Sequence, residues 1–130
     1  MRPEGWESLL AAHITTARAQ PFAWGERDCV LWCADWVLQI RGVDYAEHCR
    51  GAYATEDQAA QLLDELGFAS VSDLVDGHLD VTPVKYARRG DVMLHPSGML
   101  GICDGAHAYF LTASSVTRIG FLHCTRAWTV

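Results

Sequence analysis

The segment 29–40 is apolar almost all the way round a helix, and it constrains the fold more than any other feature. Its sequence is CVLWCADWVLQI, in which only Asp35 and Gln39 are polar. A helix that is apolar on every side lies inside a domain rather than on its surface. Asp28 directly before it is a natural N-cap, and Gly42 beyond it supplies a stop. We therefore predict a central helix around which the rest of the chain packs.

Helical patterns fill the first half of the chain, and strand-like patterns fill the second. Apolar residues recur at helical spacing over 6–18, a capping box at 55–58 opens a helix that stops at Gly67, and a short helical turn is expected over 70–75. Helices followed by strands indicate an α+β fold, with the helices packed on a small antiparallel sheet or half-barrel. The core face of the helix after residue 55 is expected to be Ala59, Leu62, Leu63 and Leu66. The expected strands are 91–94, 99–103, 108–111, 118–122 and 126–130.

The length and charge of the chain limit its function. Its 130 residues, 50% of them hydrophobic, suit one domain with a proper core, so residues 1–130 are expected to form a single domain. Ten Lys and Arg stand against sixteen Asp and Glu, and no basic cluster exceeds Arg88-Arg89, which argues against nucleic-acid binding. No apolar run approaches the roughly twenty residues of a membrane span, and no signal-peptide pattern occurs. We therefore expect a soluble protein made inside the cell.

The cysteines could in principle form a metal site. An odd count without a signal peptide argues against a disulfide framework. Cys29 and Cys33 lie one helical turn apart, so a metal or iron–sulfur site completed by a third cysteine is geometrically open, although the chain has no CxxC pair. Most of these thiols fit better as small buried hydrophobes, so we expect no metal and no cofactor. The remaining three cysteines are Cys49, Cys103 and Cys124.

Cys29 differs from the other cysteines because it begins the predicted buried helix. The partial positive charge at a helix N-terminus favours the thiolate and lowers the pKa of a cysteine. A rigid helix start would also hold a nucleophile in place. The alternative is that Cys29 is simply the first apolar residue of a core helix. A second candidate feature is Trp24, which, with Gly25 and Asp28, is expected to line a groove for a glycan or a peptide stem.

The residues around Cys29 resemble the NlpC-type cell-wall cysteine peptidases. The segment PFAWGERDC at 21–29, the apolar helix, RRGDVML at 88–94 and LGI at 100–102 follow in the order of that family, over roughly residues 21–105. The chain is still more similar to the small NlpC-like proteins encoded among phage tail genes, of which a closing RAW, here 126–128, is also typical. The resemblance implies a papain-like α+β fold with Cys29 in the nucleophile position.

The chain departs from this family at the catalytic base. The position that matches the catalytic His is Met99, and the place of the third polar group falls near Leu111 or Thr112. A cysteine nucleophile needs a base, usually His, within hydrogen-bond reach, and Met cannot take a proton. His95 and His107 are the candidates for a relocated base, although the alternation of side chains along a strand gives neither a reason to face the thiol.

Two functions of different classes follow from the resemblance. The first is a protein of a phage or phage-like tail, at the tail tip or hub or in tail assembly, built on a degenerate NlpC-like fold without catalysis. Such a protein would be assembled in the bacterial host cytoplasm, reside in the virion tail, and contact other tail proteins and peptidoglycan. The alternative is an active cysteine peptidase or amidase that cleaves peptidoglycan through Cys29 and a relocated His. A third hypothesis is a tail protein that carries a metal on its cysteines.

Overall fold

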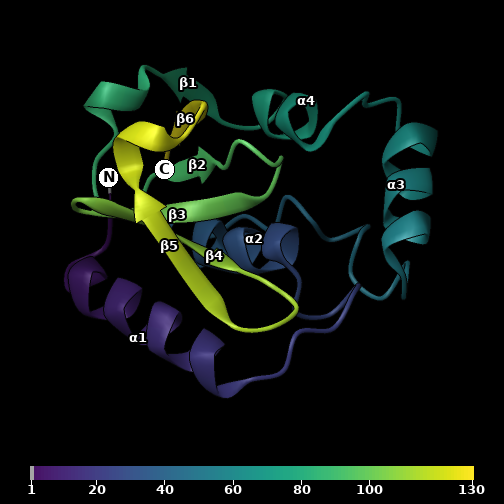
Figure 1. Cartoon of the computed structure of the whole chain (residues 1–130), viewed down its shortest axis with the longest axis horizontal. Coiled ribbons are helices and arrows are strands. Elements are labelled where there is room, and N and C mark those ends of the chain that lie inside the picture. The colour runs from purple at the N-terminus through teal and green to yellow at the C-terminus, as the bar shows by residue number, and fades with distance from the viewer. Residues whose placement is uncertain (1) are drawn as a thin grey trace.

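The computed structural model describes residues 2–130, and in this range all the α-helices precede all the strands (Figure 1). The α+β class expected from the sequence is therefore confirmed. The helices are α1 (Trp6–Ala19), α2 (Cys29–Arg41), α3 (Glu56–Glu65) and α4 (Val71–Asp76). The strands are β1 (Asp80–Thr82), β2 (Val92–Leu94), β3 (Leu100–Asp104), β4 (His107–Leu111), β5 (Val116–Gly120) and β6 (Arg126–Thr129). Two 3-10 helices, η1 (Val84–Tyr86) and η2 (Phe121–His123), connect strands.

The described residues form one antiparallel sheet of six strands in the order β1-β6-β2-β3-β4-β5. The sequence analysis missed β1, which pairs with β6 at the edge of the sheet. It also placed the fourth expected strand, 118–122, too late, because β5 spans Val116–Gly120 and residues 121–123 form η2. Asp91 was expected to begin a strand, but it precedes β2 and its carboxylate is turned inward to accept main-chain hydrogen bonds.

Helix α2 lies against the sheet and forms the centre of the core, as its composition predicts. Its buried residues include Trp32 and Trp36, and its main contacts with the sheet are to β3 and β4. The Asp28 carboxylate caps its first turn by accepting the Leu31 N–H, while Gly42 ends it in the left-handed conformation at φ 73°. Local cap signals thus set both ends of the helix that starts at Cys29.

The two faces of the sheet pack into different clusters. Leu100 and Ile102 of β3 point toward α2, whereas Cys103 points to the opposite face and joins a cluster with Phe110 and Cys124. This separation follows from the alternation of side chains along a strand. It decides which residues of the strands can reach Cys29.

Helix α3 stands apart from the sheet and from α1, at one side of the molecule (Figure 1). The prediction that its apolar face belongs to the core holds only for Leu62, which is partly buried against the small cluster of Leu31, Ala46 and Cys49. None of the α3 residues is fully buried, and Leu66, just after the helix, is 45% exposed. Half of the α3 capping box is present, with the Thr55 hydroxyl accepting the Gln58 N–H at 3.1 Å, while the Gln58 side-chain oxygen accepts the N–H of Ala54 rather than of Thr55. The apolar face of α3 lines a cavity instead. Within residues 2–130, none of the helices is long and apolar enough to cross a bilayer.

Candidate functional site

Cys29 lines a cavity of about 280 Å³ that most of the predicted site residues share. Trp24, Asp28 and Met99 line it together with Cys29, and Gly25 lies in the loop beside it. The structure therefore brings together residues that are up to 75 positions apart in the sequence (Trp24 to Met99). The remaining wall is mostly apolar and comes from α3 and α4, with residues such as Leu62, Leu63, Leu66, Val71 and Leu74.

Met99 directly precedes β3, in the position where the resemblance expects a catalytic His. It lines the same cavity as Cys29, and none of the histidines in the described range does. The Cys29 thiol therefore has no imidazole in its cavity to take its proton. A thioether is at best a weak hydrogen-bond acceptor and does not replace a base.

His95 is not among the residues that line the cavity, and its ring packs on the other side of its loop. Its ring packs edge-on against Phe110, with 5.1 Å between the ring centroids, and Phe110 is in the cluster that faces away from α2. The Nδ1 atom of His95 accepts the Ser97 N–H at 2.9 Å. His95 is thus a turn residue held by its own loop.

His107 is separated from Cys29 by the length of a strand. It is the first residue of β4 and pairs with Asp104, the last residue of β3. Leu100, next to the cavity, is four residues away along β3, which corresponds to roughly 13 Å. At the other end of β4, Leu111 is buried in the core and the Thr112 hydroxyl donates to Ser115 O at 2.7 Å. Neither forms part of a relay to a base.

The predicted lowering of the Cys29 pKa is wrong. Burial raises the pKa of the Cys29 thiol, and the neighbouring Asp28 charge raises it further, while the Leu100 amide acts in the opposite direction. The partial positive charge of the helix N-terminus favours the thiolate, whereas desolvation penalises it, and desolvation is the largest cause of the shift here. The raised pKa means that Cys29 is a neutral thiol near pH 7.

Asp28 is the residue that holds the site together, whereas the sequence indicated its capping role and a place in the groove wall. It is 1% exposed. Its carboxylate accepts the Leu31 N–H at 3.0 Å, the Gly25 N–H at 3.0 Å and the Tyr53 hydroxyl at 2.6 Å. Tyr53 was not predicted, because nothing in the sequence links it to a residue 25 positions earlier. Burial, followed by the hydrogen bond to Asp28, raises the pKa of Tyr53.

Gly25 lets the loop before α2 approach the Tyr53 segment closely. Its φ of 79° lies in the left-handed region, and a Cβ at this position would overlap the main-chain oxygen of Tyr53. The Gly25 carbonyl also accepts the Gly51 N–H at 2.8 Å. These contacts tie the cavity wall at 24–28 to the segment 51–53 and make the mouth of the cavity rigid.

The hypothesis of a metal site on the cysteines finds no support. Cys103 and Cys124 pack on the face of the sheet away from α2, so they cannot join Cys29 and Cys33. In the part of the chain that the structure describes, no group of three or more His, Cys, Asp or Glu side chains is arranged to hold a metal ion. Burial raises the pKa of both Cys103 and Cys124 to about 11. These thiols act as core residues.

Comparison with known proteins gives a family but no activity. A family model described as a domain of unknown function, DUF6950, matches residues 1–130. No curated protein and no solved structure matches the chain significantly. Because the match spans the entire sequence, the chain belongs to the DUF6950 family.

Proposed function

We propose that this protein is a catalytically inactive relative of the NlpC-type peptidases that serves as a structural component of a phage or phage-like tail, at its tip or hub or during its assembly. The observation that carries the proposal is Met99, which lines the cavity of Cys29 where a base would be needed. The tail assignment itself draws on the resemblance of the segments around Cys29 and at 126–128.

The local chemistry supports loss of catalysis. A cysteine peptidase depends on a thiolate, and burial raises the pKa of Cys29 rather than lowering it. His95 and His107 both lie away from the cavity. The active peptidase with a relocated base is therefore the less favoured alternative.

The order of elements around Cys29 supports descent from a papain-like fold. A buried helix begins at Cys29 and packs against an antiparallel sheet, the order of elements that the resemblance implies. Asp28 and Tyr53 keep the mouth of the cavity ordered although no reaction uses it. A rigid apolar cavity of about 280 Å³ suits contact with another tail protein or with the peptide stems of peptidoglycan.

Loss of catalysis is tested with purified protein on peptidoglycan and with thiol alkylation. We expect no wall clearing by the wild type, and slow alkylation of Cys29 at pH 7. Met99→His should speed the alkylation of Cys29, since an imidazole in the cavity stabilises the thiolate, and Met99→Leu serves as the matched control. Clearing by the wild type that Cys29→Ala abolishes would show that the enzyme alternative is correct.

The tail assignment is tested in cells that produce the natural particles. We expect the chain to sediment with purified tails and to be present at a fixed ratio to other tail proteins. Deletion of its gene should give particles with incomplete or absent tails in electron micrographs. Normal tails and undiminished infectivity after deletion would overturn the assignment.

A further inference from the structure

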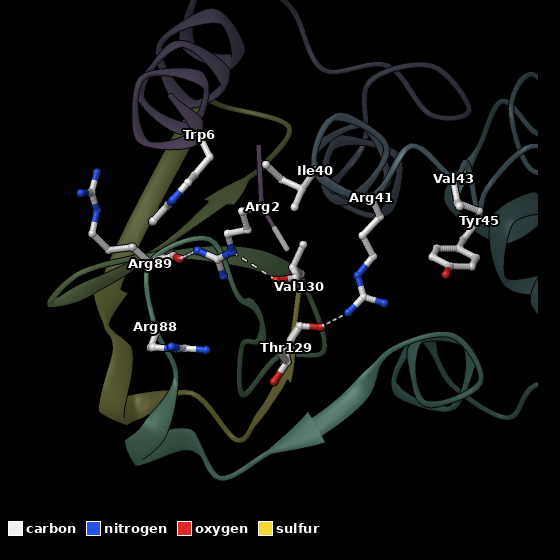
Figure 2. Close-up of a pocket in the computed structure, with 10 residues that line it drawn as sticks. All are labelled: Arg2, Trp6, Ile40, Arg41, Val43, Tyr45, Arg88, Arg89, Thr129 and Val130. Atoms are coloured by element: carbon white, nitrogen blue, oxygen red, sulfur yellow. Dashed lines mark hydrogen bonds between the residues drawn. The ribbon is translucent and has the colours of Figure 1, made fainter. Parts of the chain in front are cut away.

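A second and larger cleft lies at the opposite end of α2 from Cys29. Its volume is about 1010 Å³. Its walls come from the chain before α1, the start of α1, the end of α2, the loop before β2 and the end of β6 (Figure 2). It shares no lining residue with the cavity around Cys29. Any ligand of this cleft is therefore independent of the function proposed above.

The cleft gathers positive charge in an acidic protein. Arg2, Arg41, Arg88 and Arg89 all line it, although the chain carries only ten Lys and Arg and a net charge of −6. No Asp or Glu is among its lining residues in the described range. The separation of charge makes this cleft attractive to an anion while the rest of the surface repels one.

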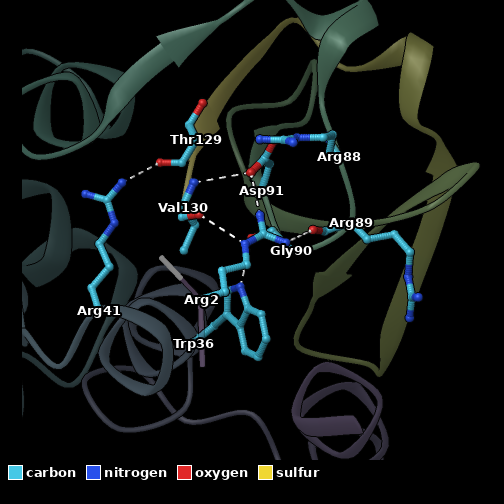
Figure 3. Close-up of polar contacts among 9 residues, drawn as sticks. All are labelled: Arg2, Trp36, Arg41, Arg88, Arg89, Gly90, Asp91, Thr129 and Val130. Atoms are coloured by element: carbon cyan, nitrogen blue, oxygen red, sulfur yellow. Dashed lines mark hydrogen bonds and ion pairs between the residues drawn. The ribbon is translucent and has the colours of Figure 1, made fainter. Parts of the chain in front are cut away.

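Arg2 and Arg89 are already occupied by the protein. Arg2 donates to Asp91 Oδ1 at 3.0 Å, to Val130 O at 3.2 Å and to the Arg89 carbonyl (Figure 3). The Arg89 Nε donates to Asp104 Oδ1 at 2.7 Å. Both charges are compensated by a carboxylate, so these two residues shape the cleft.

Arg41 and Arg88 are not compensated. Neither forms an ion pair with a residue in 2–130, and only one nitrogen of Arg41 is used, in a hydrogen bond to Thr129 O at 3.1 Å. Their guanidinium groups point toward Thr129 from opposite sides (Figures 2 and 3). Burial lowers the pKa of the Arg2 guanidinium, the charge of Asp91 raises it, and the nearby charge of Arg88 lowers it further. The two guanidinium groups therefore face a common space with unused donors.

The walls that carry these groups are rigid. The Asp91 carboxylate, 1% exposed, accepts the Arg88 N–H at 2.9 Å and the Val130 N–H at 3.2 Å, which fixes the loop and the strand end. The Gly90 carbonyl accepts the indole N–H of the core residue Trp36 at 2.8 Å. Gly90 has φ 89°, and a Cβ there would lie 2.9 Å from a guanidinium nitrogen of Arg2. The cleft is thus organised before any ligand binds.

We infer that this cleft is a binding site for a small ligand that carries a phosphate or diphosphate group, held between Arg41 and Arg88. Two guanidinium groups match a compact group of two negative charges, and their planar donors suit phosphate oxygens. The C-terminal end of α2 beside Arg41 offsets only about half a charge. The acidic surface outside the cleft disfavours a long polyanion, and Trp6 and Val43 offer apolar contact to the body of the ligand.

The test is titration of the full chain with pyrophosphate at low salt, with binding measured by isothermal titration calorimetry. We expect saturable one-site binding that weakens as salt is added, because the contacts are ionic. Arg41→Ala and Arg88→Ala should each weaken binding about ten-fold or more. Arg118→Ala is the matched control, an exposed arginine on β5 outside the cleft, and should leave binding unchanged. Unaltered thermal melting verifies that each variant is folded.

Three results would overturn the inference. The first is absence of saturable binding by the wild type at millimolar pyrophosphate. The second is an equal loss in Arg118→Ala, which would indicate general attraction rather than a site. The third is citrate binding as tightly as pyrophosphate, which would assign the cleft to carboxylates. Tighter binding of pyrophosphate than of inorganic phosphate or citrate supports it.

Discussion

Replacing Asp28 by Ala should destabilise the protein more than any other single change near the cavity. The carboxylate is almost fully buried and accepts three hydrogen bonds, from the amides of Gly25 and Leu31 and the hydroxyl of Tyr53. The alanine variant loses all three acceptors at once. The donors left behind belong to three separate segments: the loop before α2, α2 itself and the segment at 53.

The expected loss follows from these contacts. Removing an N-cap side chain costs about 1 kcal/mol. Each further donor left without an acceptor in a buried place costs about 1–3 kcal/mol. With two such donors, Gly25 N–H and Tyr53 OH, we expect the free energy of unfolding to fall by roughly 3–7 kcal/mol, a large part of the 5–15 kcal/mol typical of a domain.

The assay is unfolding in urea, with tryptophan fluorescence as the readout. Tyr53→Phe removes one donor but leaves Asp28 its two main-chain partners, so it should cost about 1–2 kcal/mol. In the double variant the two losses should not add, because the residues share one hydrogen bond. Asp28→Asn keeps an oxygen for the cap and should fall between the wild type and Asp28→Ala. A loss below about 1 kcal/mol for Asp28→Ala, or strict additivity with Tyr53→Phe, would refute this reasoning.

Three further predictions concern glycine geometry and pH. Gly25→Ala should lower the melting temperature much more than Gly51→Ala, because both have positive φ but only the Cβ at Gly25 meets another atom; equal shifts would contradict this. Stability should fall as pH rises from about 8.5 toward 11, since unfolded thiols ionise near 8.5 while burial holds the pKa of Cys103 and Cys124 at about 11. Urea midpoints that stay flat over this range would disprove it. Stability should also decline as pH falls below about 6.5, because burial lowers the pKa of His13 and the unfolded state takes the proton first. An NMR titration midpoint of His13 at or above 6.5 would show the opposite.

Features encoded in a few consecutive residues were predictable. The predicted caps of α2 and α3, at Asp28 and Thr55, accept the expected main-chain N–H groups. Ser70 caps α4 in the same way, where only a helical turn was predicted. The buried character of α2 is also visible in its composition. Strand bounds were less predictable, and β1 was missed because two of its three residues are exposed and its pairing partner β6 is more than 40 residues away.

The candidate site was predictable only where a motif carried it. The resemblance singled out Cys29 and Met99, and the structure places both in one cavity. The part played by Tyr53 was not visible, since its hydrogen bond to Asp28 depends on how two loops fold together. The apolar face of α3 was read as core because periodicity shows which side of a helix is apolar, but not what packs against it.

The sequence by itself determined the class of the fold and the central helix, and it singled out Cys29 and Met99 as residues to examine together. Only the tertiary structure decided the charge state of that thiol, because the helix end and the desolvation act in opposite directions and burial decides the balance. The same holds for the arginine cleft. Arg41 and Arg88 are 47 positions apart and face one space only because α2 and the loop before β2 meet at the end of the sheet.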